Sequence, residues 1–219
     1  MEHEEPKQAK KRQNKKSLLL ILLVVVLAAG IGLYFLKNKK PTATKNDGII
    51  TYSTDSPDES KKNAENYNWK GAPDEPKKIK ISKIGVDAFV QKAGVDQDKR
   101  VAVPDNIHLA SWFIESQKPG QSGLSVISGH VTGKTSDGIF KQLGTLTKGD
   151  TFTIELGNGA VKNYKVIDKV QVKEAESTNY LFSQNPKVKS QVNVITCGGK
   201  FNKASNQYED RIIVSAELQ

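Results

Sequence analysis

The chemistry that this chain could perform centres on its single cysteine, Cys197. The residues before it, Val192–Thr196, are mostly apolar and β-branched, and Gly198 and Gly199 follow directly. A short apolar run of this kind indicates a buried strand, and the glycine pair indicates a sharp turn of the backbone. A thiol at the end of a strand is a typical position for a nucleophile, although a free cysteine often only packs in a core. Both interpretations stay open on position alone.

Histidine is the side chain best suited to exchange protons with such a thiol. His3 lies in the N-terminal tail and His108 in a predicted loop, whereas His130 ends the run Ser125–Gly129. His130 therefore resembles Cys197 in closing an apolar run. If the two strands are neighbours in a small barrel, both side chains open onto one rim, where the imidazole could protonate a leaving amine. The alternative is a hydrogen-bonded histidine at a sheet edge.

Arginine is scarce in this chain, which has three arginines and thirty lysines. Arg211 begins the apolar run 211–216, fourteen residues after Cys197. If the segments before Cys197 and after Arg211 pair antiparallel, the thiol and the guanidinium lie at the same end of the sheet. There the planar, permanently charged guanidinium could hold substrate or offset the charge of an oxyanion. A surface ion pair with Glu209 or Asp210 is the alternative.

The composition argues against several other kinds of site. One cysteine and two plausible histidines give no recognisable ligand spacing, so neither a metal nor another cofactor is expected. The net charge of +9 is not gathered into an arginine-rich patch with interleaved aromatic residues. Nucleic acid is therefore not an expected partner.

The N-terminal region has the pattern of a membrane anchor. Residues 1–17 form a basic tail, and residues 18–36 are uncharged and mostly apolar, which is about the ~20 residues that cross a bilayer. Six basic residues precede this segment and four follow it, which favours a cytoplasmic N-terminus and an extracytoplasmic remainder. The alternative is a cleaved signal peptide with a small-residue site at 28–30, but the apolar run continues beyond that site.

Residues 37–76 are rich in Lys, Asn, Asp, Ser, Thr and Pro and contain few large apolar side chains. Such a segment buries too little surface to offset its ordering entropy, so we predict a flexible linker. Trp69 is an exception, which we expect to dock onto the domain that follows.

The remaining residues, 77–219, have the texture of an all-β domain. Eight short apolar runs alternate with turn residues, which favours a β-sandwich or a barrel. The sequence Leu156–Ala160 contains Asn-Gly and predicts a hairpin turn. Short helices are expected over 138–143 and 177–183. The candidate strands are Ile79–Ile81, Val86–Val90, Val101–Val103, Leu124–Ser128, Phe152–Leu156, Tyr164–Val172, Val192–Thr196 and Ile212–Ala216.

Residues 77–219 resemble a sortase, a member of the membrane-anchored cysteine transpeptidases of bacterial surfaces. The Thr-Cys-Gly-Gly sequence is more similar to the class F branch than to class A, because Asn193 and Val194 replace the Thr-Leu of the class A pattern. The resemblance is carried by the order and spacing of Val103-Pro104, Ser111–Phe113, Pro119–Gly123, Ser128–Val131, Gly138–Phe140 with Leu143, Lys148–Asp150, Thr196-Cys197 and Tyr208–Val214.

The resemblance implies an all-β fold, a closed eight-stranded sortase-type barrel with short helices, preceded by one transmembrane helix. It implies that Cys197, His130 and Arg211 are the catalytic residues and that Thr196 lines the site and touches substrate. The expected substrate is a protein with an LPxTG-like sorting signal, cleaved between Thr and Gly through a thioacyl enzyme. The expected acceptor is an amine of a cell-wall precursor or a pilin lysine.

Two other functions stay open from the residues. A thiol hydrolase on the same barrel would use water in place of the amine. A non-catalytic surface binding domain would need Cys197 only for packing.

Overall fold

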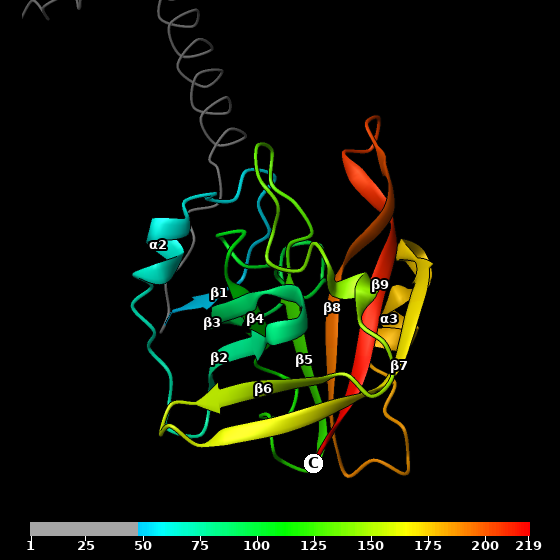
Figure 1. Cartoon of the computed structure of the whole chain (residues 1–219). Helices are drawn as coiled ribbons and strands as arrows, with labels where there is room; N and C mark the ends of the chain where they lie inside the picture. Colours follow the sequence, from blue (N-terminus) through cyan, green and yellow to red (C-terminus); the bar gives the residue numbers. More distant parts are fainter. Residues whose placement is uncertain (1–47) are drawn as a thin grey trace, which may run out of the picture. The chain divides into compact units, whose positions relative to one another are not determined.

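The computed structural model describes residues 48–219 (Figure 1). The predicted basic tail at 1–17, the predicted transmembrane anchor at 18–36 and the first part of the predicted linker lie outside the described residues. Within residues 48–219, no helix is both long enough and apolar enough to cross a membrane.

Eight strands form a closed barrel, which confirms the predicted all-β, eight-stranded barrel. The strand order is β3-β2-β6-β7-β9-β8-β5-β4, and the barrel closes because β4 pairs in parallel with β3. A short ninth strand, β1, pairs with β3 outside this ring. The strands are β1 (Ile49–Ile50), β2 (Pro76–Ile81), β3 (Val86–Ala93), β4 (Ala110–Phe113), β5 (Gly123–Gly129), β6 (Thr151–Leu156), β7 (Val161–Lys173), β8 (Ser190–Asn202) and β9 (Gln207–Leu218).

Seven of the eight predicted strands lie on strands of the barrel, and one prediction was wrong. Val101–Val103 forms only an isolated bridge between Val101 and Val95. The eighth barrel strand is instead β4, whose four residues are all buried. Its sequence, Ala-Ser-Trp-Phe, has two strand-favouring aromatic residues but is only four residues long and has no β-branched residue, so it shows no recognisable strand pattern.

The strand that leads to Cys197 is buried on both faces, which explains why its sequence is almost continuously apolar. Val192 and Val194 point into the main core inside the barrel. Ile195 belongs to a second cluster on the outer face, with Val126 of β5 and Leu181 of helix α3 (Ser177–Leu181). The part of β8 before Cys197 is therefore held by packing from both sides.

The turn and helix predictions had mixed outcomes. The hairpin at Leu156–Ala160 is confirmed, because it joins the antiparallel strands β6 and β7. Helix α3 confirms the prediction over 177–183. The helix predicted over 138–143 was wrong, and only a 3-10 turn, η2 (Leu143–Thr145), occurs there. Backbone N–H groups of this segment bond back to the residues after β5 instead of forming a helix.

Part of the predicted linker is structured. Residues 48–76 contain β1 and a short helix, α2 (Lys61–Glu65). Trp69 docks as expected: its indole Nε1 donates to the carbonyl of Pro76 at 3.1 Å, and its ring lies against Gly157 of the β6–β7 turn. The folded unit therefore begins well before residue 77, held by backbone pairing and by a few buried apolar side chains such as Ile50 and Ala64.

Candidate active site

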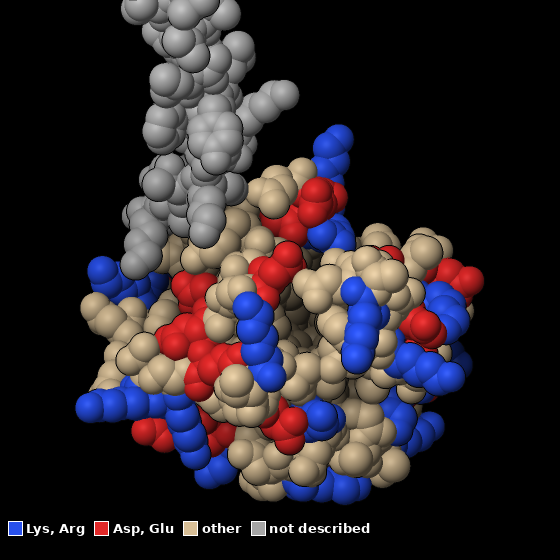
Figure 2. Space-filling model, turned by 90° about the horizontal axis from the view of Figure 1, so that it is seen from above, with Lys and Arg blue, Asp and Glu red and all other residues tan. Residues whose placement is uncertain are grey.

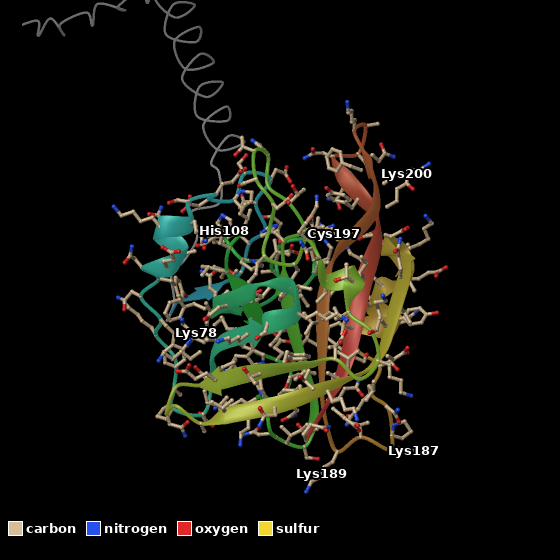
Figure 3. All side chains as sticks on the ribbon, viewed as in Figure 1. Lys78, His108, Lys187, Lys189, Cys197 and Lys200 are labelled. Carbon is tan, nitrogen blue, oxygen red and sulfur yellow. The ribbon has the colours of Figure 1, made fainter. Side chains whose placement is uncertain are left out.

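Cys197 and Arg211 face each other across two neighbouring strands. Cys197 lies within β8 and not at its end, so the predicted strand end and sharp turn were wrong: the strand continues through a bulge between Gly198 and Phe201 into the long β8–β9 hairpin (Figures 1 and 3). Strands β8 and β9 are antiparallel, and Cys197 is the direct register partner of Arg211. Directly opposed residues share one face of a sheet, with Cα atoms about 4.5–5.5 Å apart. The expected antiparallel pairing is confirmed, and it brings the thiol and the guanidinium together.

His130 lies at the end of the strand on the other side of β8. Strand β5 pairs in parallel with β8, and the last register pair is Ser128 with Ile195. If this register is extended by two residues along each strand, His130 is level with Cys197. The hydroxyl of Thr196 also donates to the carbonyl of Gly129 at 2.8 Å. The residue before the thiol is thus bonded to the residue before the imidazole.

The imidazole of His130 is held by a backbone carbonyl. Its Nε2 lies 2.7 Å from the carbonyl oxygen of Pro104. Because a carbonyl can only accept, Nε2 carries the proton in the neutral ring, and Nδ1 keeps the lone pair that can take a proton. The main chain of His130 is also fixed, since its carbonyl accepts from the N–H of the buried Phe140 at 2.9 Å.

The Arg211 side chain is only 13% exposed and is held by several acceptors. Its Nη1 donates to the carbonyls of Tyr208 and Asp210, and its Nη2 lies 3.6 Å from Glu174 Oε1. Glu209 and Asp210 both pair with Lys173 rather than with Arg211. The surface ion pair considered from the sequence is therefore not formed. The guanidinium stays close to the strand that carries Cys197.

Burial keeps both reactive groups neutral at rest. Desolvation raises the pKa of the Cys197 thiol, and the charge of Glu174 acts in the same direction, whereas Arg211 lowers it. Desolvation also lowers the pKa of His130, against the hydrogen bond to Pro104 and the charge of Asp105, which both raise it. At neutral pH a neutral thiol and a neutral imidazole are therefore the main resting forms of the two groups.

Thr196 makes a buried hydrogen bond that the sequence did not indicate. Its side chain is 3% exposed, and its hydroxyl donates to the carbonyl of Gly129. Its contact with substrate stays a prediction. Pro104, Gly129 and Glu174 were not assigned roles from the sequence. Two of these act through backbone carbonyls, which leave no side-chain signal to read.

A hollow of about 480 Å³ opens beside the β8–β9 hairpin. It is lined by Lys173–Ala175 at the end of β7, by hairpin residues between Asn202 and Glu209, and by Arg100. Glu174 belongs both to this hollow and to the contact with Arg211. Positively and negatively charged side chains are mixed on the face of the molecule seen in Figure 2. The residues from 48 to 219 contain no cluster of His, Cys, Asp and Glu that could hold a metal ion.

Comparisons with known proteins show which proteins the chain is similar to. The family model described as "Sortase domain" matches residues 79–219. Sortase A from Corynebacterium diphtheriae, as a lid mutant, is 22% identical and has a TM-score of 0.50, covering 65% of this chain and 68% of that one. Sortase C2 of pilus island 1 from Group B Streptococcus is 19% identical with the same TM-score, covering 68% of this chain and 76% of that one.

A third solved structure, sortase C-1 from Actinomyces oris, is 26% identical with a TM-score of 0.49, covering 65% of this chain and 72% of that one. No curated protein sequence matches the chain. The two structures with TM-scores of 0.50 show that the fold is shared. Because the family model covers well over half of the 219 residues, the chain belongs to the sortase family of cysteine transpeptidases.

Proposed function

We propose that this protein is a membrane-anchored sortase that cleaves an LPxTG-like sorting signal between Thr and Gly and joins the released carbonyl to an amine. The observation that carries the proposal is the register of three neighbouring strands. Cys197 is the register partner of Arg211, and β5, which His130 follows directly, pairs with β8 as far as Ser128 and Ile195; this supports a common site for the three side chains. We assign these three residues as catalytic.

In the first half of the reaction, the Cys197 proton moves to Nδ1 of His130, the nitrogen that Pro104 leaves unprotonated. The thiolate sulfur attacks the Thr carbonyl carbon and forms a C–S bond. Arg211 offsets the negative charge on the carbonyl oxygen as the tetrahedral centre forms. The C–N bond then breaks, and the imidazolium gives its proton to the departing Gly amine. The product is a thioester at Cys197.

In the second half, an acceptor amine attacks the thioester carbonyl. His130 takes a proton from this amine, the C–S bond breaks, and the sulfur leaves as a thiolate that regains its proton. An amide bond to the acceptor replaces the original Thr–Gly bond, so no net oxidant or reductant is needed. A water molecule in place of the amine would give hydrolysis instead.

The proposed sorting signal is inferred from the amino-acid sequence alone. The Thr-Cys-Gly-Gly sequence supports a class F-like member, which makes Leu-Pro-x-Thr-Gly a starting motif rather than the only one. Thr196 is proposed to line the site mainly by holding the end of β5 against β8. The acceptor is proposed to be an amine of a cell-wall precursor or a pilin lysine.

The location at the membrane is proposed from residues 18–36. In this arrangement the basic tail is cytoplasmic, and the barrel lies on the outer side of the membrane. Fractionation of cells expressing the full-length chain, with and without residues 18–36, tests the anchor. Protease added to intact cells should degrade the barrel if it is extracytoplasmic and leave it intact if it is not.

The activity is tested with the full-length protein and a panel of fluorescent peptides that vary each position of Leu-Pro-x-Thr-Gly. Mass spectrometry follows the products with and without a glycine-based amine. We expect cleavage between Thr and Gly, and a ligated product that increases with amine concentration. Cleavage unaffected by amine would indicate the thiol hydrolase instead.

Two variants control this assay. Cys197→Ala should remove both cleavage and ligation, whereas Ser183→Ala, at an exposed position after α3, should leave both within about twofold. No cleavage of any peptide in the panel, combined with no labelling of the folded protein by a thiol alkylator, would favour the non-catalytic binding domain.

A further inference from the structure

A segment that precedes the barrel contacts both loops that flank His130. We call residues 52–60 the N-terminal strap. This segment has an isolated parallel bridge between Asp58 and Asn106, a residue of the loop that follows β3. The composition of the strap is that of a linker, yet its polar groups are used by specific partners in the barrel.

The first of these loops contains Pro104, whose carbonyl receives the Nε2 proton of His130. Asp58 donates its N–H to the carbonyl of the adjacent Asp105 at 2.8 Å, and its own carbonyl accepts from Ile107 at 2.9 Å. The side-chain amide of Asn106, which is 3% exposed, donates to Asp58 Oδ2 at 3.1 Å and to the Ser60 carbonyl at 3.0 Å. The strap therefore fixes the backbone on both sides of Asn106, next to Pro104.

The second loop begins directly after His130 and runs over residues 131–137. The carboxylate of Glu59 accepts from the backbone N–H of Lys134 and, at 3.0 Å, from that of Thr135. It also accepts from the hydroxyls of Thr135 and Ser136. These bonds lower the pKa of Glu59 to about 2, so the carboxylate is ionised at any working pH.

The fit between the strap and this loop is close. A Cβ atom placed on Gly133 would lie 2.6 Å from the Glu59 carboxylate, so the carboxylate would have to move away from its present position. Lys134 adds a bond from its Nζ to the hydroxyl of Ser56 at 2.7 Å. His108, labelled in Figure 3, also contacts the strap: its Nε2 lies 3.2 Å from the carbonyl oxygen of Glu59.

We propose that the N-terminal strap positions the His130 imidazole, with Glu59 and Asp58 as positioning residues that act through the two loops flanking it. This inference rests on the proposed catalytic role of His130. Proton transfer needs donor and acceptor within about 2.6–3.2 Å, and displacement by about 1 Å can reduce a rate about 100-fold. Loss of the contacts between the N-terminal strap and the two loops would therefore reduce turnover while leaving the barrel folded.

The test uses the full-length chain with Glu59→Gln, which keeps the size of the side chain but places an NH₂ group opposite one of the two backbone N–H donors. The matched control is Asp150→Asn. Asp150 also accepts a backbone N–H and a hydroxyl, both from Thr147, but on a different loop. We expect Glu59→Gln to reduce kcat about tenfold with KM changed less than about twofold, and Asp150→Asn to change neither by more than about twofold.

A second readout needs no substrate, so it separates this inference from the proposed function. Nitrogen NMR of ¹⁵N-histidine-labelled protein reports which ring nitrogen of His130 carries the proton, with His130→Gln used for assignment. We expect a single Nε2–H form in the wild type and in Asp150→Asn. Glu59→Gln should give a mixture of tautomers or broadened ring signals. Unchanged His130 signals in Glu59→Gln would overturn the positioning role, even if no sorting peptide is ever cleaved.

Discussion

The hydrogen bond between Thr196 and Gly129 gives the most specific prediction, because it joins the residues directly before Cys197 and His130. Thr196→Val removes the hydroxyl and keeps the shape of the side chain. The donor is 3% exposed and the bond is 2.8 Å long, so water does not replace it easily. Loss of a net hydrogen bond costs about 0.5–1.5 kcal/mol, and an unsatisfied buried carbonyl costs about 1–3 kcal/mol.

We therefore expect Thr196→Val to lower the free energy of unfolding by about 2 kcal/mol. For a domain of this size class, that corresponds to a decrease in Tm of about 4–8 °C, which thermal unfolding monitored by circular dichroism would measure. The variant should remain folded at 25 °C. Its rate should still fall by about tenfold, because the end of β5 is no longer joined to β8 beside the reacting groups.

Thr145→Val is the matched control. Thr145 also donates its hydroxyl to a backbone carbonyl at 2.8 Å, that of Gln142, but it is exposed and lies on the η2 turn. Its loss should cost less than about 0.5 kcal/mol and leave the rate unchanged. Equal effects of the two variants on Tm and rate would refute the reasoning that burial and position make the Thr196 bond important.

Three further predictions concern the reactive groups. Burial raises the Cys197 pKa. The rate of alkylation by iodoacetamide should therefore rise with pH with a midpoint that is higher in the folded protein than in the unfolded chain. A midpoint at or below that of the unfolded chain would contradict this. Because the Glu174 charge raises the same pKa, Glu174→Gln should lower the midpoint and speed alkylation at pH 8; slower alkylation would contradict it. Gly138→Ala should reduce kcat more than about tenfold, because its Cβ would overlap the carbonyl of His130. In the control variant Gly144→Ala the Cβ meets only a side-chain methyl at 3.1 Å, so kcat should fall less than about twofold. Similar kinetics of the two variants would count against a fixed His130 backbone.

The sequence indicated the strands that carry or precede the three proposed catalytic residues, but their adjacency was only a condition of the argument. The apolar run before His130 marked the end of β5, whereas the run before Cys197 stopped inside β8, which continues to Asn202. These signals come from the apolar side chains of strands buried on both faces. The same logic failed for β4, whose Ala-Ser-Trp-Phe run is only four residues long and lacks β-branched residues.

The contacts that hold His130 could not be predicted for a different reason. The acceptor on Pro104 is a backbone carbonyl, which every residue possesses. Glu59 lies 75 residues before its partner Lys134, within a segment whose composition is typical of a linker. This segment is held largely by long-range hydrogen bonds to the barrel and buries only a few apolar side chains, so composition gave no indication of it.

The central claim is that Cys197 becomes acylated with the help of His130 and Arg211. The most direct measurement is intact-protein mass spectrometry of the full-length chain mixed with a sorting-signal peptide in the absence of an acceptor amine. We predict a mass increase equal to the N-terminal part of the peptide through Thr, lost on addition of amine or hydroxylamine, and absent in Cys197→Ala and His130→Gln. Because Cys197 is the only cysteine of the chain, the site of the thioester is unambiguous. Peptide cleavage that persists in Cys197→Ala, or with no transient adduct in the wild type, would contradict the account.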